Sequence, residues 1–351
     1  MRLGLTDDQL AIKEVFAGFF GKESTPAVVR AAEPGGFDPK LWRRVCETGA
    51  PGMGVAEDAG GGGASLGDLA VVAEEFGRSI APIPLIDHQV AARVLARFGG
   101  ARTDVTDGET LASFALRPAV NGSWWLVPGG SVAGLTIGLD GDELVAVESA
   151  PPAAAPRNHA AQPLADRSTA GARTVLASGD AAHAAFDRAL NEWKTLTAAT
   201  LVGIGAQALH MALDYVQSRI QFGKPIGAFQ AVQQSLADLP IAIDGGRLLA
   251  HKAAWAGDNE AAGVDGHLDI DDNDNSNFAV LAGMAFVFNA DGAAHATDRS
   301  LHFHGGYGFA EEYDIQLFYR RARGWALVYD DPARECGRLA DTMFGPRESV
   351  R

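Results

Sequence analysis

The residues best suited to chemistry lie in the stretch 215–230, which reads YVQSRIQFGKPIGAFQ. Arg219 stands near the end of a segment whose apolar residues recur at helical spacing, and Phe222-Gly223 and Pro225 follow it closely. Glycine ends helices and proline prevents them from restarting, so the sequence predicts a tight junction with a second helix from about Ala228. A guanidinium there suits a phosphate, because its fork makes two charge-assisted hydrogen bonds. The pattern also allows an arginine that only contacts the last carbonyls of its own helix.

Two further stretches combine glycine with polar or aromatic residues. Residues 304–313 read HGGYGFAEEY, and the pair Gly305-Gly306 permits another molecule to approach the backbone closely. Residues 52–61 read GMGVAEDAGG, and the last two of them begin the four-glycine run at 60–63. That run has no β-rich segment before it and no Gly-Lys-Ser/Thr ending, so we expect a surface loop and not a phosphate-binding loop.

Together the three stretches resemble the acyl-CoA dehydrogenase family. The first matches R-x-x-F-G-x-x-x-x-x-F-Q, the second resembles H-G-G-x-G-(Y/F)-T-x-E-(Y/H), and the third resembles G-x-x-x-P-E-x-x-G-G. The resemblance implies FAD as cofactor and α,β-dehydrogenation of an acyl-CoA thioester, with an electron-transferring flavoprotein as electron acceptor. It implies flavin contacts, partly to a flavin held by another subunit, for Arg219, Phe222, Gln230, His302 (glutamine in the family), Gly305 and Gly306.

The resemblance also implies a carboxylate that removes the α-proton, at one of two positions. One register holds VYDDP at 328–332, where Asp330 is a methylene shorter than the family's glutamate. The other, counted back from Arg219, falls on Trp193, with Glu192 one residue away. A one-residue slip turns a helical side chain by about 100°, so Glu192 is expected to face elsewhere, with a solvent-facing glutamate as the alternative. Glu192 and Asp330 are therefore candidates that depart from the family pattern.

This combination resembles the smaller subunits of actinobacterial heteromeric acyl-CoA dehydrogenases of sterol side-chain degradation. The resemblance implies an α2β2 assembly in which a larger partner subunit carries the base and this chain completes the flavin site. Two alternatives stay open. The chain could be a self-sufficient homomeric dehydrogenase that uses Glu192 or Asp330, or a non-enzymatic assembly partner.

The elements that must position these residues form an α+β arrangement. We expect an N-terminal helical domain over 1–110, a shortened central β domain over 111–178, and a C-terminal helical bundle over 179–351. The β-type runs are 111–116, 123–127, 134–138 and 143–147, ending in an Ala/Pro-rich loop at 151–156. The predicted helices cover 6–32, 65–76, 89–98, 181–218, 229–257, 276–301 and 313–326, with a short one near Trp42 and a last one in the tail.

Composition limits the remaining functions. The net charge of −15 argues against nucleic acid or an anionic membrane as partner. Cys46 and Cys336 are the only two cysteines, so a disulfide scaffold or a cysteine metal site is not expected. The Asp-rich stretch 265–275 lacks the glycine and the final glutamate of a calcium loop, and we predict no metal. The beginning of the chain has no apolar signal region and no stretch reads as a membrane span, which favours the cytoplasm.

Overall fold

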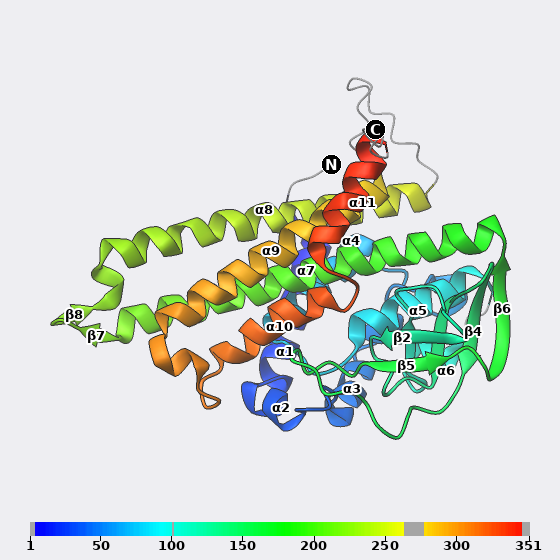
Figure 1. Ribbon diagram of the computed structural model, residues 1–351, viewed down its shortest axis with the longest axis horizontal. Coiled ribbons are helices and arrows are strands. Elements are labelled where there is room, and N and C mark those ends of the chain that lie inside the picture. Colours follow the sequence, from blue (N-terminus) through cyan, green and yellow to red (C-terminus); the bar gives the residue numbers. More distant parts are fainter. Residues whose placement is uncertain (1–3, 100–101, 263–276, 346–351) are drawn as a thin grey trace, which may run out of the picture. The chain divides into compact units, whose positions relative to one another are not determined.

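The computed structural model describes residues 4–99, 102–262 and 277–345 (Figure 1). The chain divides into two compact units. The helical unit comprises Met1–Lys22, Ala70–Ile80 and Lys194–Arg351, and the mixed unit comprises Glu23–Leu69 and Ala81–Trp193. The Asp-rich stretch 265–275, which was compared with a calcium loop, lies outside the described residues.

Helices precede and follow the strands along the chain, which confirms the predicted α+β class. The three predicted domain bounds remain a prediction. Over the described residues the helices are α1 (Asp7–Glu23), α2 (Pro26–Ala31), α3 (Pro39–Cys46), α4 (Leu66–Arg78), α5 (Leu85–Arg97), α6 (Thr103–Thr106), α7 (Asp180–Ser218), α8 (Gln230–Ala261), α9 (Phe278–Phe303), α10 (Ile315–Leu327) and α11 (Pro332–Phe344), with 3-10 turns η1 (Ala50–Gly52), η2 (Glu57–Ala59), η3 (Ile226–Ala228) and η4 (Gly305–Phe309).

Local side-chain chemistry explains where two of these helices begin. Thr6 and Gln9 exchange hydrogen bonds with each other's backbone N–H, a capping box that starts α1. Ser65 and Asp68 form the same reciprocal pair before α4. The single helix predicted over 6–32 is wrong, because the chain leaves helical geometry after Glu23 and starts α2 with a proline in its first turn.

The mixed unit is built on a four-stranded sheet in the order β1-β3-β4-β6. Strand β1 (Ala112–Phe114) runs parallel to β3 (Leu135–Asp140), while β4 (Glu143–Glu148) pairs antiparallel with both β3 and β6 (Ala172–Ser178). A separate pair joins β2 (Ser123–Val127) to β5 (Ala165–Ser168). Trp124 is fully buried, and its indole N–H donates to the Leu139 carbonyl at 2.9 Å. That bond fastens β2 to the larger sheet.

The last two strands of this sheet region were not predicted. The predicted β-type runs stop before the Ala/Pro-rich loop 151–156, yet β5 and β6 follow that loop, inside the span 111–178 that was predicted for the β domain. Most of β6 is exposed, so its residues show no alternation between apolar and polar types. Strand β6 forms because its backbone pairs with β4 over six residues, an interaction that local sequence does not reveal.

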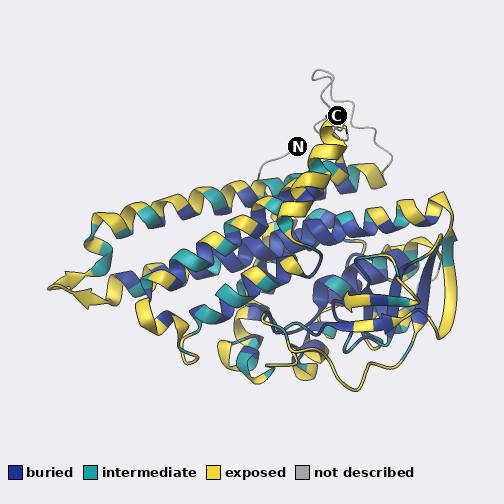
Figure 2. Ribbon diagram, in the orientation of Figure 1, coloured by how far each residue is buried: buried dark blue, intermediate teal, exposed yellow. Residues whose placement is uncertain are grey.

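The helical unit packs α7, α8 and α9 side by side, and a buried apolar core runs between them (Figures 1 and 2). The core residues are Val202, Leu209, Ala212 and Val216 of α7, Leu236, Leu239 and Ile243 of α8, and Ala296 of α9. Small residues let the helices approach: a Cβ at Gly246 of α8 would lie 2.0 Å from Oδ1 of Asn289 in α9. The amide of Asn289 in turn donates to the Gly246 carbonyl.

Two helices, α7 and α9, are long and apolar enough to cross a membrane by length and composition alone. The sequence-based statement that no stretch reads as a membrane span is therefore wrong by this criterion. Much of the apolar surface of both helices is buried inside the protein, as expected for core helices of a large helical unit.

Candidate functional site

The junction after α7 is a small β-hairpin. Helix α7 ends at Ser218, and β7 (Ile220–Gln221) pairs antiparallel with β8 (Lys224–Pro225). Phe222 and Gly223 are the two turn residues, with φ of 52° and 80°, as in a type I′ turn. The prediction that Phe222-Gly223 stops the helix is wrong, because the helix has already ended and these residues reverse the chain. After η3, α8 begins at Gln230, two residues later than expected.

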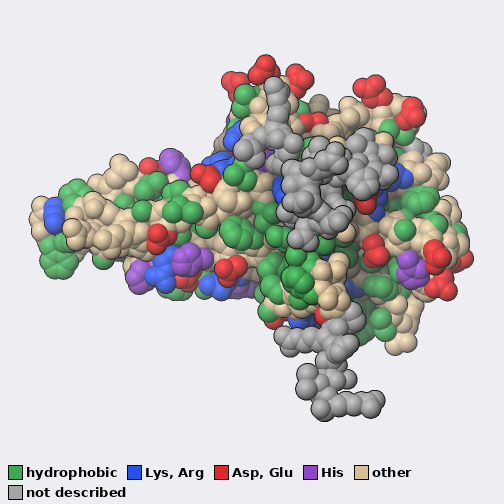
Figure 3. Space-filling view, turned by 90° about the horizontal axis from the view of Figure 1, so that it is seen from above, with side chains coloured by type: hydrophobic (Ala, Val, Ile, Leu, Met, Phe, Trp, Pro, Cys, Tyr) green, Lys and Arg blue, Asp and Glu red, His purple; other side chains and the backbone are tan. Residues whose placement is uncertain are grey.

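The hairpin presents apolar and basic side chains outward. Phe222 is 91% exposed at the turn, and its ring meets Phe229 edge-on with centroids 6.1 Å apart. The ammonium of Lys224 lies 4.4 Å from the centroid of the same Phe229 ring. In Figure 3, hydrophobic and basic side chains gather at the left-hand tip, where this hairpin lies. A flat aromatic surface beside cations fits a ligand that combines a ring with negative charge.

The second motif follows the end of α9 directly. Gly305 has φ of +62°, a conformation that glycine adopts without strain, and it starts η4. Gly306 has no such backbone requirement, and a Cβ built there would meet no atom of the chain within 4 Å. Packing within the described chain does not explain the glycine at 306. Its missing side chain leaves an exposed backbone surface that a second molecule can approach.

The two motifs lie together at one end of the helical unit. Tyr215, in the last turn of α7, stacks on His304 with centroids 4.3 Å apart, and its hydroxyl lies 3.5 Å from the His304 carbonyl oxygen. The guanidinium of Arg219 lies over the ring of Tyr307 in η4, 5.8 Å from its centroid. Segments almost ninety residues apart in sequence are thus joined by two ring contacts. His304 itself is buried and bonded to the Ser300 carbonyl, and burial lowers the pKa of its imidazole.

The six predicted flavin-contacting residues are all exposed, and they are Arg219, Phe222, Gln230, His302, Gly305 and Gly306. His302 is exposed at the end of α9 and does not pack in the core. Within the described residues the guanidinium of Arg219 makes no ion pair and no hydrogen bond to the carbonyls of α7, and its side chain rests on Tyr307. Tyr215, Lys224 and Tyr307 were not singled out from the sequence. Their aromatic and basic types inside the two motifs were the available signal.

Glu192, the first candidate base, is held in a cluster of arginines in the mixed unit. Its carboxylate is 0% exposed, so the solvent-facing alternative is wrong. Arg93 donates to it at 3.1 Å and 3.4 Å, Arg97 also donates to it, and Nε of Arg188 lies 3.5 Å away. Burial alone would raise the pKa of Glu192, but Arg93 and Arg97 outweigh it and lower the pKa to about 2. A carboxylate with so low a proton affinity is a poor base.

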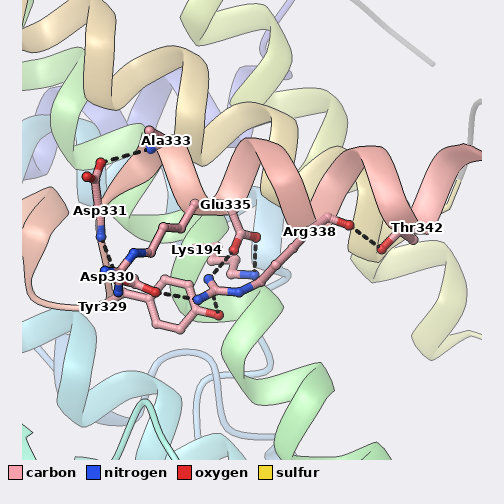
Figure 4. Close-up of polar contacts among 9 residues, drawn as sticks. Lys194, Tyr329, Asp330, Asp331, Ala333, Glu335, Arg338 and Thr342 are labelled. Atoms are coloured by element: carbon pink, nitrogen blue, oxygen red, sulfur yellow. Dashed lines mark hydrogen bonds and ion pairs between the residues drawn. The ribbon is translucent and has the colours of Figure 1, made fainter. Parts of the chain in front are cut away.

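Asp330, the second candidate base, is tied to α11 in the helical unit (Figure 4). The guanidinium of Arg338 pairs with its carboxylate, and Nη1 of Arg334 lies 3.4 Å away. Slight burial acts to raise the pKa of Asp330, but the Asp331 N–H and Arg338 outweigh it, and the pKa is lowered. Arg338 also contacts Glu335, which accepts from the ammonium of Lys194 at 2.5 Å. Asp330 therefore anchors a helix through ion pairs.

Asp87, at the start of α5, is a third carboxyl that sequence reasoning did not find. Trp193, the residue at the family's alternative base position, donates its indole N–H to Asp87 at 2.8 Å. No cation within the described residues pairs with Asp87, and burial raises its pKa to about 6 despite the Trp193 hydrogen bond. Of the three carboxyls, Asp87 has the proton affinity best suited to proton transfer near neutral pH.

The glycine run at 60–63 is a self-bonded loop. The N–H groups of Gly61, Gly62 and Gly63 donate to the carbonyls of Ala56, Gly52 and Val55. Because these donors are used within the loop, they are not directed at a phosphate, which agrees with the expectation of a surface loop before α4.

The helical unit with its two exposed glycine- and aromatic-containing motifs, together with a unit built on a small sheet, is the fold of the acyl-CoA dehydrogenase class of oxidoreductases. The family model described as "Acyl-CoA dehydrogenase, C-terminal domain" matches residues 183–328, and "Acyl-CoA dehydrogenase, N-terminal domain" matches residues 6–103. The chain belongs to the acyl-CoA dehydrogenase family.

Similar proteins come from both sequence and structure comparisons. The chain is 29% identical over 345 residues to the acyl-CoA dehydrogenase IpdE2 of Mycolicibacterium smegmatis, covering 97% of this chain and all of that one. A variant of the Tcur3481-Tcur3483 steroid ACAD is 27% identical with a TM-score of 0.78, covering 97% and 98% of the two chains. The ChsE4-ChsE5 complex from Mycobacterium tuberculosis shares the fold at 20% identity, with a TM-score of 0.83 and coverage of 99% and 100%.

Proposed function

We propose that this chain takes part in FAD-dependent α,β-dehydrogenation of an acyl-CoA thioester as the flavin-site-completing subunit of a heteromeric dehydrogenase. A larger acyl-CoA dehydrogenase subunit would hold most of the flavin and carry the base. The observation that carries the proposal is the outward-facing group of Arg219, Phe222 and Gly306 at one end of the helical unit.

The residues present fit a flavin dinucleotide that another subunit brings to this surface. Arg219 offers a fork of N–H donors to a diphosphate, and Phe222 offers an exposed ring face to a base such as adenine. The bare backbone at Gly306 leaves room for a flat group to approach closely. When bound, FAD would supply the hydride acceptor for the substrate's β-carbon, and its electrons would pass to an electron-transferring flavoprotein.

We place the base in the partner because of the state of the two candidate carboxylates, Glu192 and Asp330, in this chain. Glu192 is fully buried and ionised among arginines, and Asp330 is paired with Arg338. A base must reach the α-carbon, and its pKa must lie near the pH at which the enzyme works. Neither carboxylate meets that requirement, while the flavin-contacting motifs are retained.

The substrate class is proposed from the relatives. A relative at 27% identity is a steroid ACAD whose name pairs two gene products, as does the name of the ChsE4-ChsE5 complex. By analogy, we propose that the substrate of this chain is a sterol side-chain CoA ester. We also propose an α2β2 assembly and a cytoplasmic location. The role of non-enzymatic assembly partner would require that Arg219 contribute nothing to flavin binding.

A second candidate function is a self-sufficient homomeric dehydrogenase, and one observation favours it. Asp87 is a carboxyl without a cation partner in the described part of the chain, and its pKa is raised to about 6. If the chain works alone, Asp87 is a better candidate than Glu192 or Asp330. Replacement of Asp87 by Asn would then abolish turnover while the flavin stays bound.

The test is the flavin absorbance spectrum of the purified chain, alone and co-expressed with the product of a neighbouring gene. The proposal expects a colourless chain alone and a yellow complex that an acyl-CoA bleaches. A yellow homo-oligomer bleached by an acyl-CoA overturns the proposal and favours the self-sufficient enzyme. If an acyl-CoA bleaches the flavin of the Asp87→Asn complex as fully as that of the wild-type complex, the base is not Asp87.

A further inference from the structure

No ion pair within the described residues fixes the orientation of the Arg219 side chain. It lies one residue beyond α7 and is exposed, and no carboxylate in the described residues pairs with it. Its backbone is fixed, since its N–H donates to the Tyr215 carbonyl at 2.8 Å and its carbonyl accepts from Ile226 at 2.9 Å. Its long side chain, however, would sample many rotamers in water, and ordering it costs free energy when a ligand binds.

The aromatic ring of Tyr307 is the contact that restrains this side chain. The guanidinium carbon of Arg219 lies 5.8 Å from the Tyr307 centroid, within the range of a cation–π contact. Tyr307 is itself held, because it stacks on Tyr313 with centroids 5.3 Å apart and 26° between the ring planes. Tyr307 is the third residue of η4, directly after the glycine pair, and its carbonyl accepts from the Ala310 N–H at 3.1 Å. The result is a series of contacts that runs from Tyr313 through Tyr307 to the guanidinium of Arg219.

A guanidinium that rests on an aromatic face keeps its hydrogen-bond donors available. The five N–H groups lie in the guanidinium plane and point outward from its edge. A cation–π contact with the Tyr307 ring restrains the group without using a hydrogen-bond acceptor, so these donors stay available to an incoming oxyanion. An ion pair with a carboxylate would have consumed the same donors.

We infer that Tyr307 is a positioning residue for Arg219, which holds the guanidinium with its fork open toward the diphosphate of a flavin dinucleotide. This inference rests on the proposed function and adds a residue that acts through Arg219 and not by its own hydrogen bonds. The Tyr307 hydroxyl makes no hydrogen bond within the described residues, so the ring is the part that matters.

The experiment measures the Kd of FAD by titrating the flavin-depleted complex of this chain with its co-expressed partner, followed by flavin fluorescence. Tyr307→Leu removes the ring and should raise the Kd about two- to fivefold, the fold-change that corresponds to an exposed cation–π contact. Tyr307→Phe keeps the ring and should stay within about twofold of wild type. In the Arg219→Ala background, Tyr307→Leu should have no further effect, because there is no guanidinium left to position.

The double variant separates positioning from a general structural role. If Tyr307→Leu weakens FAD binding equally with Arg219 present and absent, the positioning role is overturned. If the Tyr307→Leu complex binds FAD as tightly as wild type, the positioning role of Tyr307 is overturned, whereas the proposed function is unaffected. A wild-type complex that binds no FAD overturns the proposed function and with it the role of Tyr307.

Discussion

Tyr215 of α7 stacks on His304 at the end of α9, with ring centroids 4.3 Å apart and 24° between the ring planes. This contact fastens the end of the arginine-bearing helix to the start of the glycine pair. Arg219 then reaches Tyr307 on the same segment. The two family motifs therefore form one surface, although each was recognised separately in the sequence.

Gly306→Ala tests whether the bare backbone at this surface serves a ligand. The added methyl meets no atom of this chain within 4 Å, and Gly306 does not need a positive φ, so the melting temperature should stay near that of wild type. Flavin retention by the complex should fall, because the methyl occupies space that a flat group approaches. Unchanged flavin retention would mean that the ligand does not lie against Gly306.

Glu192→Gln tests the structural role of the arginine cluster. The substitution removes the buried anion that Arg93, Arg97 and Arg188 share, and should destabilise the protein by about 3 kcal/mol. Urea denaturation measures this loss. Asp187→Asn, an exposed carboxylate five residues before Glu192 with no ion pair in the described residues, is the matched control and should change stability little. Equal stability of the two variants would contradict the account.

His88 makes the stability of the mixed unit depend on pH. Burial lowers the pKa of its ring to about 4, although it bonds to the Val105 carbonyl and the Ala112 N–H. The unfolded chain binds the proton near pH 6.5, so stability is full above that pH. It is lost as the pH falls from 6.5 toward 4, by up to about 3 kcal/mol.

The contribution of His88 is measured as the difference in stability between wild type and His88→Gln. The comparison is needed because the raised pKa of Asp87 changes the stability with pH in the opposite direction. Urea midpoints of wild type and His88→Gln should converge as the pH is lowered from 7.5 to 5. A constant difference between the two midpoints over that range would exclude His88 as the source of the pH dependence.

The packing of α11 against the helical unit should depend on the buried charge of Glu335. Glu335 is the one fully buried residue along α11 (Pro332–Phe344), and it joins Lys194 to Arg338 (Figure 4). Glu335→Gln should increase hydrogen exchange of the α11 amides on the order of tenfold while α7 stays protected. Asp341→Asn on the same helix is the control. Exchange that is unaffected by Glu335→Gln would show that apolar contacts hold the helix.

The long helices could be predicted because their apolar residues recur at a period of 3.6 over many turns. Predicted 181–218 became α7 (Asp180–Ser218), and predicted 276–301 became α9 (Phe278–Phe303). Strand β6 could not be predicted, since it is mostly exposed and forms by pairing with β4. The hairpin at Phe222 was missed because a positive φ at a phenylalanine is uncommon and has no local signal.

Sequence spacing singled out the predicted flavin-contacting residues but could not describe their surroundings. The one-residue slip at Glu192 was visible, whereas its arginine partners Arg93 and Arg97 lie 99 and 95 residues away in sequence. Likewise Arg219 and Tyr307 meet only after the bundle has folded. Long-range ion pairs and ring contacts of this kind decide what a candidate residue can do, and they have no periodic signature.

The central claim is that this chain completes a flavin site through Arg219. The most direct measurement is the ratio of FAD to protein in the purified complex for Arg219→Ala, with Arg323→Ala as an exposed control that pairs with Asp298. We expect Arg219→Ala to lose flavin and Arg323→Ala to keep the wild-type ratio. A complex that retains its full flavin with Arg219→Ala would contradict the claim.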